Sequence, residues 1–210
     1  MIEPIPCVRF RTAELSARER YQLLTSLVVP RPIGWISTRS VDGTPNLAPF
    51  SYFMAVSPTP FLVAASIGSR AGRPKDTLRN ILDTGAFCVN VVTERHFEAM
   101  NQTSAEYGPE VDEFAAAGLE AAMSDVVPAP FVADCPAVLE CRLHEVVELR
   151  NSPNTLVIGE VLGIRISEEL PFVPGTLAVD PAVLRPIGRL WGDHYMMPGE
   201  VSVLERPKVG

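Results

Sequence analysis

The sequence predicts a mainly β protein whose antiparallel strands form a barrel or a sandwich, rather than a doubly wound α/β sheet. Short, β-prone apolar runs recur along the chain, and turn-forming residues separate them. Proline occurs 20 times in 210 residues, twice the usual ~5%, and many prolines fall between these runs. Residues 137–149 and 155–166 form a long hairpin pattern around a turn at residues 151–154, which is typical of an antiparallel sheet.

Six strands are expected, in order, at residues 33–39, 46–56, 61–67, 86–92, 137–149 and 155–166. Asp42-Gly43 carries the hairpin signature between the first two strands, and Pro49 marks a bulge or an edge position in the second. In the fifth strand one face is predicted to hold Leu139, Cys141, Leu143, Val147 and Leu149, alternating with Glu140, Arg142, His144 and Glu148. The apolar residues in phase on the sixth strand are Leu156, Ile158, Leu162 and Ile164.

A few peripheral helices accompany the strands. Ser16 and Glu19 have the spacing of a capping box, so a short helix is expected to follow and to stop before Pro30. A second helix is expected from Asp76 or Thr77 to Gly85, which suits the position after a helix end. Further helices are expected at residues 94–102, capped by Thr93, and at residues 112–118.

Length and composition indicate one globular domain at residues 16–198, between an N-terminal arm (1–15) and a C-terminal tail (199–210). Apolar residues make up 47% of the chain, charged residues 20%, and the net charge is -7. An acidic chain of this kind is not expected to bind nucleic acid, which needs a broad basic face. No apolar run approaches the ~20 residues of a membrane helix, and the N-terminus lacks the pattern of a signal peptide.

The residues that could carry hydrolytic, redox or metal chemistry are scattered. Cys7, Cys88, Cys135 and Cys141 show no C-x-x-C spacing, so we expect free thiols in a cytoplasmic protein. The three histidines lie far apart and no G-x-S-x-G motif is present. No metal site and no dedicated catalytic residue is therefore predicted.

Residues 66–79 form a basic stretch in a chain that is acidic overall. An apolar strand is followed by a loop with Gly68 and Gly72, and the loop is followed by the start of a helix. The stretch contains four basic residues, Arg70, Arg73, Lys75 and Arg79. Hydroxyls come from Ser66, Ser69 and Thr77. Backbone N–H groups and the helix dipole favour an anion at such a helix start, so the stretch predicts a phosphate site. The alternative is a solvated basic loop.

Residues 46–53 are apolar and aromatic, yet they include Pro49, so their backbone cannot be fully paired in a sheet. Free backbone groups beside apolar walls suit a flat heterocycle with polar edges. An edge strand with a bulge explains the same pattern equally well. Together the two stretches suggest a phosphorylated aromatic cofactor without identifying it.

Several motifs occur in one order along the chain: residues 30–38 (PRPIGWIST), 46–53 (NLAPFSYF), 75–81 (KDTLRNI), 101–104 (NQTS) and 112–114 (DEF). They resemble the flavin reductase-like family of FMN-binding split barrels. The tail at residues 189–195 (RLWGDHY) is similar to that family's Arg-x-Gly-Gly-x-x-Tyr ending. Trp191 departs from it, because the family often has glycine there, and we assign this residue no ligand role.

The resemblance implies a six-stranded antiparallel split barrel of Greek-key type and a homodimer with one FMN per subunit near the interface. Asn46, Ala48, Pro49, Phe50 and Ser51 would line the isoalloxazine edge, and Ser66, Gly68, Lys75, Asp76 and Thr77 would surround the phosphate. Arg31, Asn101, Ser104 and Tyr195 would close the site, from the same or the other subunit.

The resemblance further implies an NAD(P)H-dependent flavin reductase, with NADH or NADPH as electron donor and a monooxygenase as a candidate recipient of reduced flavin. The alternatives are a tight FMN-binding electron carrier or redox sensor without NAD(P)H turnover, and a split-barrel enzyme that acts on a separate small molecule.

Overall fold

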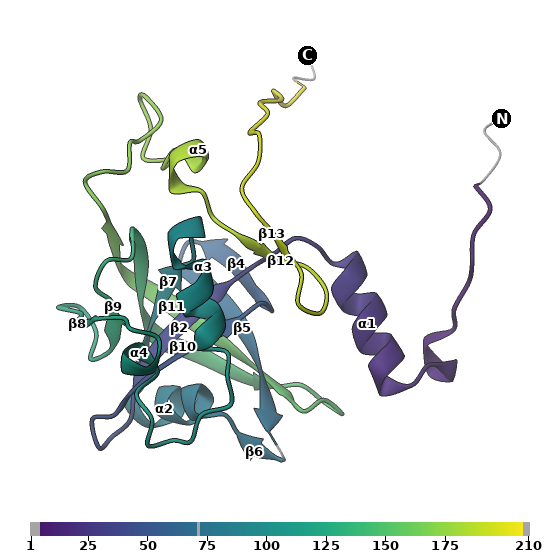
Figure 1. Ribbon diagram of the computed structural model, residues 1–210, viewed down its shortest axis with the longest axis horizontal. Helices are drawn as coiled ribbons and strands as arrows, with labels where there is room; N and C mark the ends of the chain where they lie inside the picture. Colours follow the sequence, from purple (N-terminus) through teal and green to yellow (C-terminus); the bar gives the residue numbers. More distant parts are fainter. Residues whose placement is uncertain (1–4, 71, 208–210) are drawn as a thin grey trace.

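The computed structural model describes residues 5–70 and 72–207 (Figure 1). One large antiparallel sheet has the strand order β3-β2-β7-β10-β11-β5-β4, and β6 pairs with β5. The strands are β2 (Gly34–Arg39), β3 (Pro45–Phe50), β4 (Phe53–Pro58), β5 (Phe61–Arg70), β6 (Arg73–Pro74), β7 (Ala86–Val91), β10 (Ala137–Glu148) and β11 (Asn154–Ile166). The predicted mainly β, antiparallel class is confirmed.

The sheet curls on itself because of how β3 joins β4. These strands lie at opposite ends of the strand order, yet only residues 51–52 separate them in the chain. The two edges must therefore approach each other, which closes a barrel that is split where β3 and β4 diverge. Pro49 lies on edge strand β3 opposite Trp35. Proline has no backbone N–H, and at this edge position the sheet loses no hydrogen bond because of it.

The described part of this sheet has eight strands instead of the expected six. The segment predicted as one strand at residues 46–56 breaks into β3, paired with β2, and β4, paired with β5. The short β6 supplies the other extra strand, and β5 continues to Arg70, beyond the predicted end at residue 67.

Smaller elements surround the barrel. One small sheet joins β1 (Arg31–Pro32), β12 (Gly188–Arg189) and β13 (Tyr195–Met196), and another joins β8 (Ala121–Met123) to β9 (Pro130–Val132). The helical segments are η1 (Thr12–Glu14), α1 (Ala17–Leu27), α2 (Asp76–Thr84), η2 (Glu94–His96), α3 (Phe97–Gln102), α4 (Glu113–Ala116) and α5 (Pro181–Leu184). Figure 1 shows α1 standing away from the barrel, connected to it near β12 and β13.

Local sequence signals set most helix ends. The Ser16 hydroxyl accepts a hydrogen bond from the Glu19 backbone N–H at 3.2 Å, and the Ser16 backbone N–H donates to Glu19 Oε2 at 2.8 Å, which confirms the capping box. Gly85 follows α2 with φ 70°, a left-handed conformation that suits glycine. Thr93 occupies the predicted N-cap position of the helical segment that η2 and α3 form at residues 94–102, but its hydroxyl lies 3.4 Å from His96 Nδ1 and makes no capping bond.

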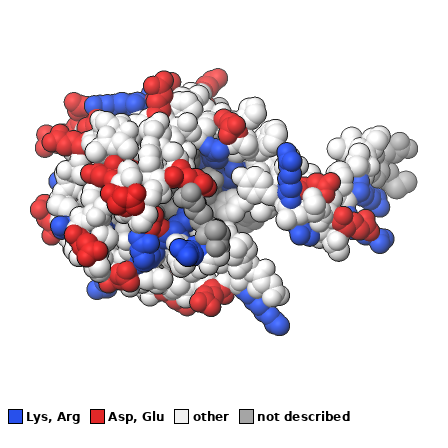
Figure 2. All heavy atoms as spheres, turned by 60° about the horizontal axis from the view of Figure 1, so that its bottom comes forward, with Lys and Arg blue, Asp and Glu red and all other residues white. Residues whose placement is uncertain are grey.

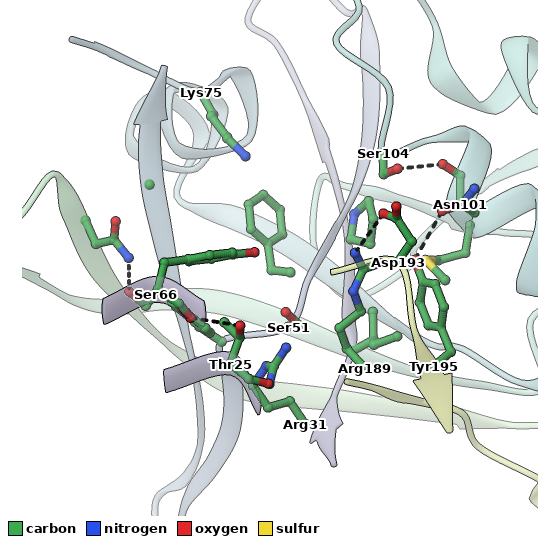
Figure 3. A pocket seen from close by; sticks show the side chains of 18 residues that line it. Thr25, Arg31, Ser51, Ser66, Lys75, Asn101, Ser104, Arg189, Asp193 and Tyr195 are labelled. Carbon is green, nitrogen blue, oxygen red and sulfur yellow. Dashed lines mark hydrogen bonds and ion pairs between the residues drawn. The ribbon is translucent and has the colours of Figure 1, made fainter. Parts of the chain in front are cut away.

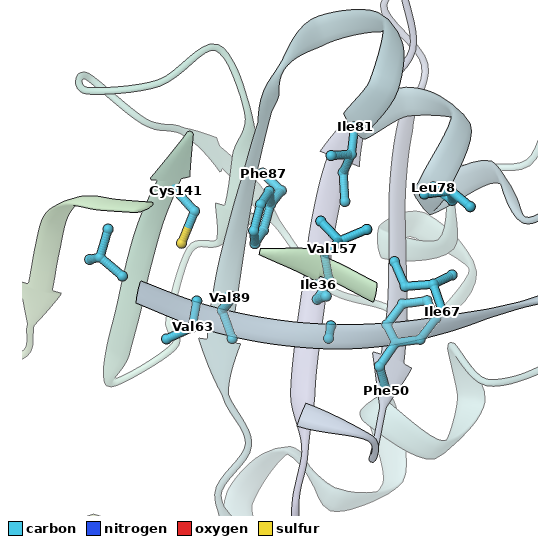
Figure 4. Close-up of a cluster of buried hydrophobic side chains, with 12 residues drawn as sticks. Ile36, Phe50, Val63, Ile67, Leu78, Ile81, Phe87, Val89, Cys141 and Val157 are labelled. Carbon is cyan, nitrogen blue, oxygen red and sulfur yellow. The ribbon is translucent and has the colours of Figure 1, made fainter. Parts of the chain in front are cut away.

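The main core fills the barrel interior (Figure 4). Ile36, Ile67 and Ile81 are completely buried there, and Phe87 points into the same cluster. α2 therefore covers one end of the barrel with its apolar face. A second cluster, around the fully buried Trp35 and Phe114, packs α3 and α4 on the outside of β2 and β3.

Two register shifts interrupt the simple alternation predicted for the long hairpin, although Leu139, Cys141 and Leu143 share the inward face of β10 as expected. Between Glu140 and Cys141 the partner strand advances by two residues, and between Leu143 and Glu145 the shift falls on β10. Each bulge changes the alternation only on the strand that carries the extra residue. Glu140 faces outward as expected, opposite Cys88, but it is buried with 2% exposure because the cluster around Cys88 and Val138 covers that face.

On β11 the core residues are Val157 and Val161. Leu156 and Ile158 of the predicted in-phase set lie on the other face, Leu162 is the extra residue of the bulge, and Ile164 pairs opposite Leu139. Leu162 and Ile164 are 44% and 49% exposed. Both faces of this strand are apolar, so periodicity alone could not choose between them.

The four cysteines are free. Burial raises the pKa of Cys88 to about 12 and that of Cys135 to about 11, so both stay protonated thiols at neutral pH. Within the described residues, no helix has the length and hydrophobicity needed to cross a membrane.

Candidate functional site

A cavity of about 530 Å³ opens at the split in the barrel. The connection between β3 and β4 forms its floor, with Pro49, Phe50, Ser51 and Tyr52. The remaining walls come from α1, β1, β5, the start of α2, α3, the start of β11 and the β12–β13 hairpin. Elements far apart in the sequence thus converge here because the strand order brings both sheet edges together.

One end of the cavity is suited to an anion. Lys75 is the N-cap residue of α2, and its side chain cannot accept a hydrogen bond. α4, in contrast, has Asp112 as its N-cap residue, and the Asp112 carboxylate accepts from the backbone N–H groups of Phe114 and Ala115. The first turn of α2 is therefore left without a capping side chain, and both its dipole and the Lys75 ammonium favour a negative ligand. Figure 3 shows Lys75 at one side of this cavity.

Ser66 and Gly68 on β5 lie beside this helix start. Asn154 Nδ2 donates to Ser66 Oγ at 3.1 Å, so the Ser66 hydroxyl proton remains available for another acceptor. A Cβ at Gly68 would lie 3.2 Å from Asn154 Oδ1. A side chain at this position would therefore press against Asn154, which lies opposite Gly68 in the β5–β11 pairing.

The middle of the cavity is apolar and aromatic. Phe50 is buried, and Lys75 Nζ lies 5.5 Å from the centre of its ring. The Tyr52 carbonyl accepts from the Ser66 backbone N–H at 2.8 Å, which holds the β3–β4 connection against β5. Burial raises the pKa of Tyr52, so its hydroxyl is neutral at physiological pH.

α3 and the β12–β13 hairpin form the opposite end. Tyr195 Oη donates to Asn101 Oδ1 at 3.1 Å, and the Ser104 hydroxyl donates to the Asn101 carbonyl at 2.6 Å. The Arg189 guanidinium lies over the Tyr195 ring, 4.3 Å from its centre, and donates to Tyr195 Oη and to the Gly192 carbonyl. The Tyr195–Asn101 bond holds the hairpin against α3, and the Arg189 contacts stabilise the hairpin itself (Figure 3).

Arg31 fastens two of the walls together. Its Nη1 donates to the Thr25 and Val28 carbonyls at 2.7 Å each, and its Nη2 donates to the Leu190 carbonyl at 2.6 Å. The residue is 7% exposed. Arg31 therefore closes the site by tying the end of α1 to the C-terminal hairpin, which places Tyr21 and Thr25 on the cavity wall.

The structure brings most of the predicted site residues to this one cavity, namely Arg31, Pro49, Phe50, Ser51, Ser66, Gly68, Lys75, Asn101, Ser104 and Tyr195.

The side chains of four other predicted residues do not line the cavity. Asn46 and Thr77 are buried and bond to each other, with Thr77 Oγ1 donating to Asn46 Oδ1 at 2.7 Å. Ala48 packs against the barrel core. The Asp76 carboxylate pairs with Arg79 at 2.6 Å.

Sequence reasoning missed Tyr21, Thr25, Asn154, Arg189 and Asp193, which also line the cavity. Arg189 and Asp193 lay within the tail motif but were not selected. Asn154 could have been found from the long hairpin, since its turn places it beside the glycine loop. Trp191 lies outside the cavity and stacks on His194 at 5.6 Å.

Figure 2 shows acidic side chains over much of the visible face and several basic ones gathered around a hollow near its middle. The chain as a whole carries a net charge of -7. A local basic hollow on an acidic surface favours a small anionic ligand over an extended polyanion.

Comparison with known proteins is consistent with this geometry. The model of the flavin reductase like domain matches residues 26–179. An uncharacterized protein of Aquifex aeolicus is 40% identical over 190 residues, which cover 90% of this chain and 95% of that protein.

Two solved structures are similar over nearly the whole chain. Nitrilotriacetate monooxygenase component B from Bacillus cereus is 31% identical with a TM-score of 0.89, covering 96% of this chain and 100% of that one. The 2-nitrobenzoate 2-nitroreductase NbaA of Pseudomonas fluorescens is 28% identical with a TM-score of 0.86, covering 95% and 96%.

Proposed function

The chain belongs to the flavin reductase-like family, and from this premise we propose that it is an FMN-dependent oxidoreductase that takes hydride from NADH or NADPH. The observation that carries the proposal is the cavity at the barrel split, which has an uncapped helix start with Lys75 at one end and an aromatic floor in its middle. A phosphate and a flat ring are the two features that such a cavity selects.

The residues present fit FMN. Lys75, the Ser66 hydroxyl and the first-turn N–H groups of α2 would hold the phosphate. The backbone of residues 49–51 would face the ring, because Pro49 and the break between β3 and β4 leave part of that backbone outside the sheet. The hairpin residues Arg189 and Tyr195 would bound the far end of the site.

FMN, when bound, supplies the hydride-accepting chemistry, so the protein needs no acid or base of its own. The task of the chain is to orient two flat rings and to exclude water between them. Phe50 and Tyr52 supply apolar surface for this purpose. Burial raises the pKa of Tyr195, which keeps its hydroxyl protonated and able to donate at neutral pH.

Turnover tests this proposal. We expect anaerobic stopped-flow mixing of the FMN-loaded protein with NADH or NADPH to bleach the flavin absorbance, and steady-state oxidation of the nucleotide to depend on added FMN. FMN binding without reduction by either nucleotide would favour the tight electron carrier or sensor instead. A protein that binds no FMN in a titration would contradict the flavin assignment itself.

A homodimer is part of the proposal. Strands β4, β5 and β11 expose five large apolar residues, Met54, Val56, Phe61, Leu162 and Ile164, each by 42–52%. Exposed apolar residues that lie close together on a folded protein commonly mark interaction sites. A second copy of the chain would cover these residues.

We expect light scattering to give twice the mass of the chain for the wild type and the mass of a single chain for Met54→Glu/Leu162→Glu. Buried charges without partners would oppose association in the variant. Leu204→Glu is the matched control, because Leu204 is 96% exposed on the C-terminal tail, and it should remain dimeric. A monomeric wild type would contradict the dimer.

We further propose that reduced flavin passes to a monooxygenase, since the Bacillus cereus relative is a monooxygenase component. The four free cysteines are consistent with a reducing compartment, and we place the protein in the cytoplasm.

A further inference from the structure

A buried polar network connects α4 to the helix start that faces the cavity. It consists of Thr38 on β2, Asn46 on β3, Thr77 and Asn80 on α2, and Glu113 on α4. None of these five residues is more than 7% exposed. Among these five residues only Thr77 lies in the first turn of α2. Glu113 belongs to the sequence motif at residues 112–114, which has no role in the cavity or in the proposed chemistry.

The hydrogen bonds of this network fix the orientation of the Asn46 amide. Asn46 Nδ2 donates to Glu113 Oε1 at 2.9 Å, and the Leu47 backbone N–H donates to Glu113 Oε2 at 3.1 Å. Because a carboxylate accepts only, it fixes the Asn46 amide with its nitrogen toward α4. The amide oxygen must then face the opposite way, toward α2.

That amide oxygen holds the first turn of α2. Asn46 Oδ1 accepts from Thr77 Oγ1 at 2.7 Å and from Thr38 Oγ1 at 3.2 Å. Asn80 Nδ2, one turn further along α2, donates to Thr38 Oγ1 at 3.1 Å. The helix is therefore attached to β2 and β3 by two of its own side chains, directly after Lys75.

We propose that Glu113 is a positioning residue for the phosphate end of the cavity, acting through Asn46 and Thr77 on the first turn of α2. The inference rests on the proposed function, since it requires a phosphorylated flavin at that helix start. Glu113 touches no ligand in this arrangement. Its contribution is to orient one amide, which in turn sets where the N–H groups of α2 and the Lys75 side chain point.

The two N–H donors that face Glu113, from Asn46 and Leu47, support a specific requirement for a carboxylate. Desolvation raises the pKa of this group, while hydrogen bonds from its own backbone N–H, from Leu47 and from Asn46 act in the opposite direction. Glutamine has the same shape, but it must turn an NH₂ group toward one of two N–H donors. One hydrogen bond is then replaced by a contact between donors.

The test compares FMN with riboflavin, which lacks the phosphate. We expect Glu113→Gln to raise the Kd of FMN about tenfold, the effect of losing one hydrogen bond to a charged group, and to leave the Kd of riboflavin within about twofold. Glu120→Gln removes the same charge from an exposed residue beyond α4 and should change neither value. Thermal melts identify any variant that fails to fold.

Thr77→Val breaks the network at its other end with a side chain of equal size. It should cause the same loss of FMN affinity, and the double variant should lose no more than the stronger single variant, because both act through Asn46. Equal losses for FMN and riboflavin, or unchanged FMN affinity in Thr77→Val, would overturn the positioning role alone. A wild-type protein that binds neither flavin would overturn the proposed function, and this inference with it.

Discussion

Replacing Arg31 with methionine is expected to lower the free energy of unfolding by about 3 kcal/mol, because three carbonyls lose one buried charged donor. Those carbonyls belong to Thr25, Val28 and Leu190, so the loss falls on the junction between α1 and the C-terminal hairpin. α1 has little other attachment, since Thr25 is its only buried residue. We therefore expect α1 to detach and FMN binding to weaken together with stability.

Urea unfolding and limited proteolysis check this result. Arg31→Met should unfold at lower urea concentration and be cleaved faster within residues 17–30 than the wild type. Arg18→Met is the control, because Arg18 is exposed on the same helix, and both of its values should match the wild type. If Arg31→Met kept wild-type stability and protease resistance, Arg31 would not be what fastens α1.

The fold could be predicted well wherever local signals are strong. The capping box at Ser16 and the glycine after α2 fixed helix ends because each makes a bond or conformation that few other residues allow. The long hairpin was recognisable, and its inward residues Leu139, Cys141 and Leu143 were predicted correctly, but the positions where the alternation breaks were not. Bulges near Cys141 and Glu145 depend on pairing with β11, and no property of a single strand reveals them.

The site was predictable in its location more than in its contacts. The strand-to-helix loop at Lys75 and the apolar segment around Pro49 both reach the cavity. These two segments could be selected beforehand because clustered basic residues and a proline within a strand are easily recognised in a sequence. The inward turn of Asn46 and Thr77 could not be foreseen. Asn46 bonds to Glu113, which is 67 residues further along the chain, and such a pairing appears only after the chain has folded.

Loss of the phosphate contacts should give the largest effect on binding. Lys75→Ala combined with Ser66→Ala is expected to raise the Kd of FMN about 100-fold, since two hydrogen bonds to a charged group contribute ~3 kcal/mol together. Riboflavin should bind the variant nearly as well as the wild type, because neither side chain is assigned to the ring. Fluorescence titration of both flavins measures the difference directly.

The salt dependence of FMN binding provides a second test of the Lys75→Ala/Ser66→Ala variant. Lys75 is exposed, so its attraction for a phosphate is screened by ions, and FMN affinity of the wild type should fall as salt rises. The double variant should lose most of that dependence. Arg142→Ala, on the exposed side of β10 and paired with Glu160, should retain both the affinity and the salt effect. Equal losses for FMN and riboflavin in the double variant would place the phosphate elsewhere. If the phosphate lies at the start of α2, these two side chains contact the phosphate and not the ring, so their removal should weaken the binding of FMN and leave that of riboflavin unchanged.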